Sequence, residues 1–263
     1  MMKIKTTDII KKKNKQKITV LTCYDYSFAK ILDDSGIDMI LVGDSLANVV
    51  LGLKETRSIS TLEMINHTKA VALGTTKALV VADMPYLSYQ KDHSKALANA
   101  KKFIKAGSDA VKIEWFSDCK KVIKQLIAKK IPVMGHIGLT PQTAHLLGGY
   151  KVQGRDKETA KRLLEQAKIL EDLGVFSLVL ECLPSELAAK ITKMLKIPTI
   201  GIGAGKHRDG QVLVLYDLLG LYPGKKAKFV KVYKDISLDI KTAVKSFQQE
   251  VKSGKYPDSQ HSY

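Results

Sequence analysis

The stretch Met39–Ser45, MILVGDS, decides the fold expected for this chain, because a short apolar run ends there in a glycine, a carboxylate and a hydroxyl. The same pattern recurs at Ala78–Pro85, Ala110–Glu114, Val133–Leu139, Ser177–Leu183 and Pro198–Gly205. Continuous apolar runs of this kind are typical of parallel strands that are covered on both faces. We therefore expect a parallel sheet with polar side chains gathered at the carboxyl ends of its strands.

One further strand is predicted before this series and one after it, which brings the total to eight. They lie at Lys17–Asp25 and Gln211–Asp217. Apolar residues at helical spacing separate most of the strands, as in Tyr26–Ser35, Asp92–Ala106 and Glu158–Leu173. Strands that alternate with helices in this way favour an α/β fold of the (β/α)8 TIM barrel type, with a doubly wound open sheet as the alternative. In such a barrel the catalytic residues lie at the carboxyl ends of the strands.

The length of the chain, 263 residues, suits one such barrel, so a single domain is predicted for residues 1–263. A short basic helix from Thr7 to about Gln16 is expected to close one end of it, and a helix at Leu238–Val251 precedes a polar tail. Thr61 is predicted to cap another helix without a capping box, because Met64 stands three residues later. The segment Thr140–Arg155 is too long for an ordinary connection and is therefore expected to be functional or mobile.

The charge balance is unusual, with 43 basic and 26 acidic residues and a net charge of +17. The lysines are spread over nearly every predicted helix and aromatic residues make up only 6% of the chain, so no basic stripe with stacking residues appears. A nucleic-acid partner is therefore not predicted, although a basic binding module remains the rival from a different functional class. An anionic substrate would still benefit from the positive field.

The location of the protein is predicted from three further observations. No apolar run approaches the roughly 20 residues that a membrane span requires. The N-terminus lacks the apolar core of a secretory signal. The three cysteines, Cys23, Cys119 and Cys182, are far apart and show no CxxC spacing, which indicates neither a disulfide framework nor a zinc site. We expect a protein of the reducing cytoplasm without a membrane partner.

Three acids, Asp44, Asp83 and Glu114, stand at the ends of the second, third and fourth strands. These strands would be neighbours in a barrel, and three converging carboxylates would repel one another unless a cation sat between them. Hard oxygen ligands suit Mg²⁺ or Mn²⁺. The alternative for each acid alone is a helix cap, but three acids at equivalent places predict a metal site.

Three further side chains are candidates on the same rim. Lys112 points to the same face as Glu114, two residues later, and is predicted to bind a substrate carboxylate; a buried ion pair or a Schiff-base nucleophile are the alternatives. His136 is a candidate substrate contact or an ordinary core histidine. Glu181 is the candidate base, because partial burial between Leu180 and Cys182 would raise its pKa, or else a structural carboxylate.

The GIGAG stretch at Gly201–Gly205 fails the dinucleotide-binding pattern, because Lys206 occupies the place of the third glycine. It indicates either close approach of the backbone to a ligand or tight packing.

Several longer motifs carry a family resemblance. They are GDSL (Gly43–Leu46), DMPYLSY (Asp83–Tyr89), GHIGLTPQ (Gly135–Gln142), GGYKVQGR (Gly148–Arg155), LECLP (Leu180–Pro184) and GIGAG with DGQVLV (Gly201–Val214). With these motifs in this order, the chain resembles the ketopantoate hydroxymethyltransferase (3-methyl-2-oxobutanoate hydroxymethyltransferase) family from about Lys17 to its end. Trp115 and Phe116 stand where that family usually has Gly-Gly, so the shape of the following loop is left open.

The resemblance implies a Mg²⁺-dependent TIM barrel of the phosphoenolpyruvate/pyruvate superfamily. Such an enzyme transfers a hydroxymethyl group from 5,10-methylenetetrahydrofolate to 3-methyl-2-oxobutanoate through a magnesium-stabilised enolate, giving 2-dehydropantoate (ketopantoate) for pantothenate and coenzyme A biosynthesis. It also implies a homo-oligomer, commonly a decamer. Asp44, Asp83 and Glu114 match the metal positions, Glu181 matches the proton acceptor, and Asp44, Ser45, Asp83 and Lys112 match the oxoacid site. A metal-dependent C–C lyase of the same superfamily is the nearest rival.

Overall fold

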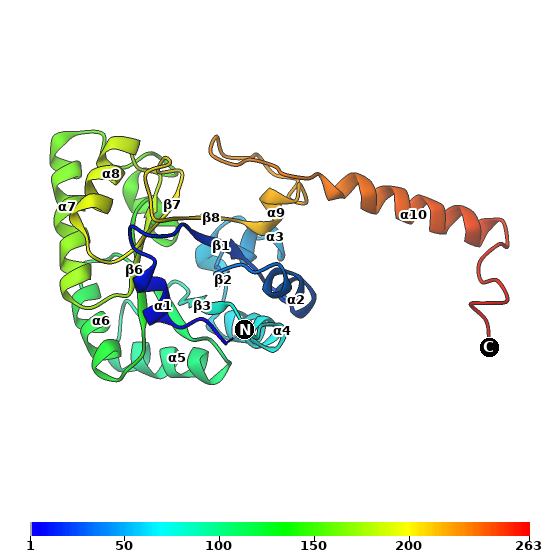
Figure 1. Ribbon diagram of the computed structural model, residues 1–263, viewed down its shortest axis with the longest axis horizontal. Helices are drawn as coiled ribbons and strands as arrows, with labels where there is room; N and C mark the ends of the chain where they lie inside the picture. Colours follow the sequence, from blue (N-terminus) through cyan, green and yellow to red (C-terminus); the bar gives the residue numbers. More distant parts are fainter. Residues whose placement is uncertain (1) are drawn as a thin grey trace. The chain divides into compact units, whose positions relative to one another are not determined.

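Each of the eight predicted strands forms in the structure, a computed structural model that describes residues 2–263. All pair in parallel with their sequence neighbours, and β1 pairs with β8, so the sheet is a closed barrel (Figure 1). The TIM barrel is therefore confirmed and the open sheet is wrong. The strands are β1 (Ile18–Thr22), β2 (Met39–Val42), β3 (Leu79–Asp83), β4 (Ala110–Glu114), β5 (Val133–Gly138), β6 (Ser177–Glu181), β7 (Thr199–Ile202) and β8 (Gly210–Leu213).

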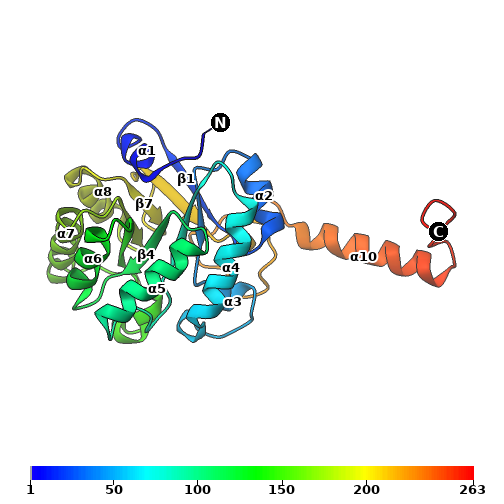
Figure 2. The ribbon, with the colours of Figure 1, turned by 90° about the horizontal axis from the view of Figure 1, so that it is seen from below.

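Helices surround this barrel (Figure 2). They are α2 (Tyr26–Asp34), α3 (Leu46–Val49), α4 (Thr61–Gly74), α5 (His93–Lys105), α6 (Cys119–Ala128), α7 (Lys157–Asp172) and α8 (Ser185–Met194), with two 3₁₀ turns, η1 (Thr56–Ser58) and η2 (Pro141–Leu147). Local signals explain their bounds. The Asp92 side chain, for example, accepts a hydrogen bond from the Lys95 backbone and starts α5, and Gly107, at φ +106°, follows its end.

The interior of the barrel is filled by apolar side chains from the strands, as is usual for barrels of this size. Helix α1 (Thr6–Lys11) adds Ile9, which is fully buried in the same cluster. The expectation that an N-terminal helix closes one end of the barrel is thus confirmed. The packed interior leaves the carboxyl ends of the strands as the place where polar side chains can gather.

Several of the predicted boundaries are wrong. Helix α1 runs from Thr6 to Lys11, with Lys5 rather than Thr7 at its N-cap, and ends well before Gln16. Strand β1 ends at Thr22 rather than Asp25. The residue that caps α4 is Ser60, not Thr61, and it forms a capping box with Glu63: the Glu63 backbone donates to the Ser60 hydroxyl at 3.2 Å, and the Ser60 backbone donates to the Glu63 carboxylate at 2.8 Å. The prediction missed this box because its register was one residue too late. The last strand ends at Leu213 rather than Asp217.

The chain divides into two compact units, one ending at Val214 and the other covering Leu215–Tyr263. The second unit holds α9 (Leu215–Leu218) and α10 (Ile236–Lys252). Helix α10 buries none of its residues, and an apolar stripe of Ile240, Val244, Phe247 and Val251 is about half exposed along it. The single domain expected for residues 1–263 stays a prediction. Within residues 2–263, no helix combines the length and the apolar character that crossing a membrane would require.

Candidate active site

The predicted site residues meet at the carboxyl ends of five neighbouring strands. Strand pairing places Asp83 beside Lys112, Glu114 beside His136, and Gly138 beside Glu181. Partners in register point to the same face of a sheet, so these side chains share one side of the barrel wall. Asp44, Asp83, Lys112, Glu114 and His136 are all at most 5% exposed. The structure therefore brings together the acids that the sequence separates by seventy positions.

Asp44, Asp83 and Lys112 form the first half of the site. The backbone N–H of Asp44 donates to Asp83 Oδ2 at 3.0 Å, and Lys112 Nζ lies 2.6 Å from Asp83 Oδ1. Burial by itself lowers the pKa of Lys112, but attraction to the neighbouring carboxylates, led by Asp83, outweighs burial and raises it. Lys112 is therefore a permanent cation, which suits binding of a substrate carboxylate and disfavours the Schiff-base alternative, which needs a neutral amine.

This arrangement disfavours the charged form of Asp44. Burial, followed by repulsion from Asp83 and Glu114, raises the pKa of Asp44 to about 7, although Lys112 opposes the shift. At neutral pH a buried carboxyl group with this pKa is only partly ionised. Further positive charge beside it would favour its ionised form.

Glu114, His136 and Glu181 form the second half of the site. His136 Nδ1 lies 3.5 Å from a Glu114 oxygen, and Nε2 lies 3.2 Å from a Glu181 oxygen. Burial lowers the pKa of His136, but the contacts with both glutamates outweigh it and raise the pKa to about 9. His136 is thus an imidazolium at neutral pH, held between two carboxylates. Its role as a substrate contact stays a prediction.

The backbone around Glu181 is unusually constrained. Cys182, the next residue, has φ +48°, a conformation that residues with a side chain rarely adopt. Its N–H donates to the Ile202 carbonyl at 2.9 Å, and its carbonyl accepts from the Gln153 N–H at 2.9 Å. On the other side, a Cβ on Gly138 would lie 2.2 Å from the Glu181 carbonyl oxygen. Strain held in place by neighbours in this way is common at functional sites.

Gln142 and Tyr89 are site residues to which sequence reasoning assigned no role. Gln142 Nε2 donates to Asp44 Oδ2 at 2.9 Å and to the Met84 carbonyl at 3.0 Å, while its backbone N–H donates to Glu114 Oε2 at 3.1 Å. The Tyr89 hydroxyl donates to Gln142 Oε1 at 2.8 Å and accepts from the Glu114 N–H at 3.3 Å. Both lie in motifs that carry the resemblance, but nothing in the pattern reveals that they span the site.

Ser45 belongs to a second small network at this rim. The Tyr24 hydroxyl, fully buried, donates to Thr22 Oγ1 at 2.7 Å and lies 2.8 Å from Ser45 Oγ. Ser45 therefore lies next to Asp44 with its hydroxyl oriented by Tyr24. Two of the GIGAG glycines, in contrast, pack against protein: a Cβ on Gly201 would lie 2.6 Å from Arg208 Cγ, and one on Gly205 would lie 2.1 Å from Ser185 Oγ, which favours tight packing at these two positions.

The donor set can be compared with the needs of a metal ion. Residues 2–263 contain no group of three or more His, Cys, Asp or Glu side chains already close enough to hold one. However, Asp83 Oδ1 and Glu114 Oε1 are buried carboxylate oxygens that each face one basic group, Lys112 Nζ at 2.6 Å and His136 Nδ1 at 3.5 Å. The rim also has four carboxylates against two basic groups, Lys112 and His136. Carboxylate oxygens with excess negative charge fit a hard divalent cation.

Comparison with known proteins gives a consistent result. The family model for ketopantoate hydroxymethyltransferase matches residues 3–259. The chain is 52% identical to the 3-methyl-2-oxobutanoate hydroxymethyltransferase of Clostridium botulinum over 95% of this chain and 92% of that protein. It is 49% identical to that of Syntrophus aciditrophicus over 98% of this chain and 96% of that protein.

Two solved structures of similar fold are much more distant in sequence. A phosphoenolpyruvate phosphomutase from Streptomyces platensis superposes with a TM-score of 0.64 at 13% identity, covering 95% of this chain and 88% of that one. A 2,3-dimethylmalate lyase, a member of the PEP mutase/isocitrate lyase superfamily, superposes with a TM-score of 0.60 at 13% identity, covering 97% and 92%. These likenesses support the fold.

Proposed function

Because the chain belongs to the ketopantoate hydroxymethyltransferase family, we propose that the residues at the ends of β2 to β6 form its catalytic centre. The activity is that of a 3-methyl-2-oxobutanoate hydroxymethyltransferase, which forms ketopantoate for pantothenate biosynthesis. The family implies 5,10-methylenetetrahydrofolate as the one-carbon donor. The assignment of roles to individual residues is the proposal.

Asp44, Asp83 and Glu114 would hold Mg²⁺ in this proposal. The support is the excess of carboxylates over basic groups at the rim, the burial of Asp44, Asp83 and Glu114, and the raised pKa of Asp44. When bound, the cation would supply Lewis-acid polarisation of the keto group, which makes the neighbouring C3 proton more acidic.

The cationic and polar groups beside those acids would bind the oxoacid. Lys112, a buried and permanent cation, would attract the carboxylate of 3-methyl-2-oxobutanoate. Asp44 and Asp83 flank that position, and Ser45 adds a hydroxyl oriented by Tyr24. His136, the last of the predicted contacts, comes from β5, the strand that pairs with the β4 strand of Lys112. Charged groups on both sides of a small substrate would fix its orientation before reaction.

Glu181 would accept the proton from C3. Its side chain is 15% exposed, against 2% for His136, and the imidazolium of His136 lies 3.2 Å away and neutralises its charge. Water releases the methylene carbon of the donor as formaldehyde, which breaks its two bonds to nitrogen and leaves tetrahydrofolate. The deprotonated C3 carbon then attacks this carbon, the new C–C bond forms, and the former carbonyl oxygen takes a proton to become the hydroxyl of the hydroxymethyl group. The observation that carries this proposal is the shared network in which Lys112, the carboxylates and the His136–Glu181 pair meet at one rim.

Exchange of the C3 proton tests the proposed base directly. In deuterated water with Mg²⁺ and 3-methyl-2-oxobutanoate, Glu181→Gln should slow exchange at least about a hundredfold, the usual contribution of a general base, while substrate binding persists. Glu186→Gln, which changes an exposed glutamate on α8, is the matched control and should exchange like the wild type. Exchange by Glu181→Gln at the wild-type rate, followed by NMR, would remove Glu181 from this role.

Assembly and compartment complete the proposal. A homo-oligomer, the family's decamer, is supported by the half-exposed apolar stripe of α10, which would be covered in an assembly. Light scattering should give a mass well above one chain. The reducing cytoplasm is supported by the three cysteines, all of which are free thiols.

A further inference from the structure

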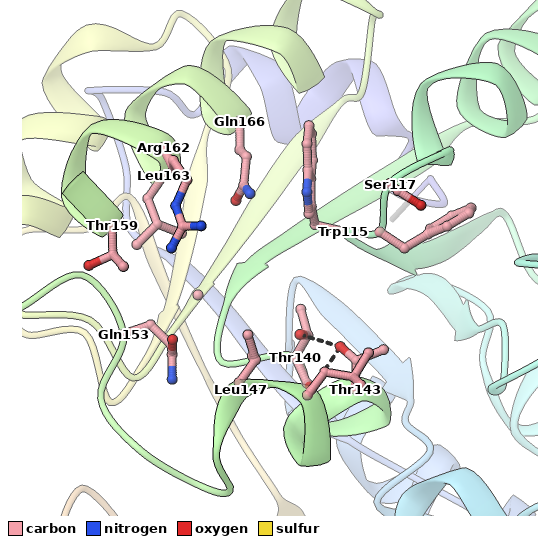
Figure 3. A pocket seen from close by; sticks show the side chains of 13 residues that line it. Trp115, Ser117, Thr140, Thr143, Leu147, Gln153, Thr159, Arg162, Leu163 and Gln166 are labelled. Atoms are coloured by element: carbon pink, nitrogen blue, oxygen red, sulfur yellow. Dashed lines mark hydrogen bonds between the residues drawn. The ribbon is translucent and has the colours of Figure 1, made fainter.

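A cavity of about 370 Å³ opens beside the proposed site, between the loops after β4 and β5 and the helix α7 (Figure 3). Trp115 and Phe116 come from the loop after β4, and Arg162 and Gln166 come from α7. In Figure 3, the α7 side chains lie on one side of the cavity and Trp115 lies on the other. Gln153, from the long segment before α7, borders the cavity below them.

Residues that line the cavity adjoin three members of the proposed site, Glu114, His136 and Glu181. Trp115 directly follows Glu114, and its backbone N–H donates to the His136 carbonyl at 2.9 Å. Gly138 lines the cavity and pairs in register with Glu181. A ligand held here would therefore be able to present one end at the reacting carbon.

The lining selects a planar aromatic ligand that bears an anion. Trp115 and Phe116 offer ring faces and edges against which another ring can pack. Ion pairs on α7 involve Lys168, whereas none within residues 2–263 involves Arg162, so this guanidinium is available to a ligand carboxylate. The side-chain amides of Gln153 and Gln166 can donate to and accept from a polar linkage between the ring and the anionic group of the ligand.

We propose that this pocket holds the p-aminobenzoylglutamate arm of the folate donor, an inference that rests on the proposed function. The benzoyl ring would pack against Trp115 and Phe116, and a glutamate carboxylate would pair with Arg162. The cavity volume is near the lower end of the roughly 300–1,000 Å³ of small-molecule pockets, which suits this arm and not the whole donor. The one-carbon unit is bonded to the p-amino nitrogen, so an arm seated here leaves that carbon at the edge facing Glu181.

The single tryptophan of the chain makes the pocket observable, because all tryptophan fluorescence comes from Trp115. Titration of the full-length protein with p-aminobenzoylglutamate should quench this fluorescence to saturation. Arg162→Gln should weaken the binding about tenfold, as loss of a hydrogen bond to a charged group predicts. The same variant should raise KM for methylenetetrahydrofolate about tenfold with little change in kcat, because a contact far from the reacting atoms contributes equally in ground and transition states.

Lys161→Gln is the matched control, since it removes the same charge from an exposed neighbour on α7 that does not line the pocket. It should leave both measurements unchanged. Absence of saturable quenching, or equal behaviour of Arg162→Gln and Lys161→Gln in a folded state verified by circular dichroism, would overturn the inference. Exchange of the C3 proton in the wild type needs the oxoacid and Mg²⁺ but no folate donor, so it tests the proposed function separately. Exchange that persists while the pocket result is negative refutes the pocket alone.

Discussion

Replacement of Gln142 by leucine tests whether the site is held together by the amide that joins its acids. Gln142 is 1% exposed, and the change removes its bonds to Asp44 Oδ2, the Met84 carbonyl and the Tyr89 hydroxyl. Each buried polar group left without a partner costs about 1–3 kcal/mol. Part of this loss is recovered by relaxation and by the apolar leucine, so we expect the free energy of unfolding to fall by about 3 kcal/mol.

Urea unfolding followed by circular dichroism measures this loss, with and without Mg²⁺. Added Mg²⁺ should recover part of the stability, because a cation at Asp44 replaces the lost partner. Gln153→Leu is the control: its amide donates only to the Lys151 carbonyl at an exposed position, so its stability should stay within about 0.5 kcal/mol of the wild type. A loss for Gln142→Leu no larger than that of this control would show that the amide is not what holds the acids.

Three further changes probe neighbouring parts of the site. Asp83→Asn should reduce Mg²⁺ affinity at least about tenfold in calorimetric titration, whereas Asp118→Asn, at an exposed acid after β4, should not; equal affinities would show that Asp83 is not a ligand. The pKa of His136 is raised from 6.5 to about 9, so the contribution of its charged form to stability is complete below pH 6.5 and is lost as the pH rises through 9. Across this range the free energy of unfolding should fall more for the wild type than for His136→Asn. Parallel curves would contradict the charged state assigned to His136. Gly138→Ala should cost at least about 2 kcal/mol in thermal unfolding, because φ is +99° and the new Cβ would lie 2.2 Å from the Glu181 carbonyl oxygen; Gly149→Ala, at φ +95° with nothing within 4 Å, shows the cost of φ alone, and an equal loss would exclude the clash.

The fold and the candidate acids could be predicted because both depend on local patterns. A continuous apolar run indicates a buried strand, and in Met39–Ser45 the polar residues directly follow that run. Once eight such runs alternate with helices, barrel topology places their ends on one rim. Asp83 and Lys112 then become neighbours through strand register alone.

The support around those acids could not be predicted in the same way. Gln142 is 98 residues from Asp44 in sequence, and their hydrogen bond depends on the path of the turn η2 over the rim. Likewise, the cavity at Trp115 exists because the loop after β4 stands opposite α7, a placement that no periodicity encodes.

The order of residues along the chain was enough to determine the barrel, the rim and the acids on it, because strand periodicity and strand ends are properties of short segments. Only the tertiary structure decided that His136 is held between two glutamates, that Gln142 joins Asp44 to Glu114, and that a pocket adjoins the site. Those features are contacts between segments far apart in sequence, and their geometry is determined by how the loops pack.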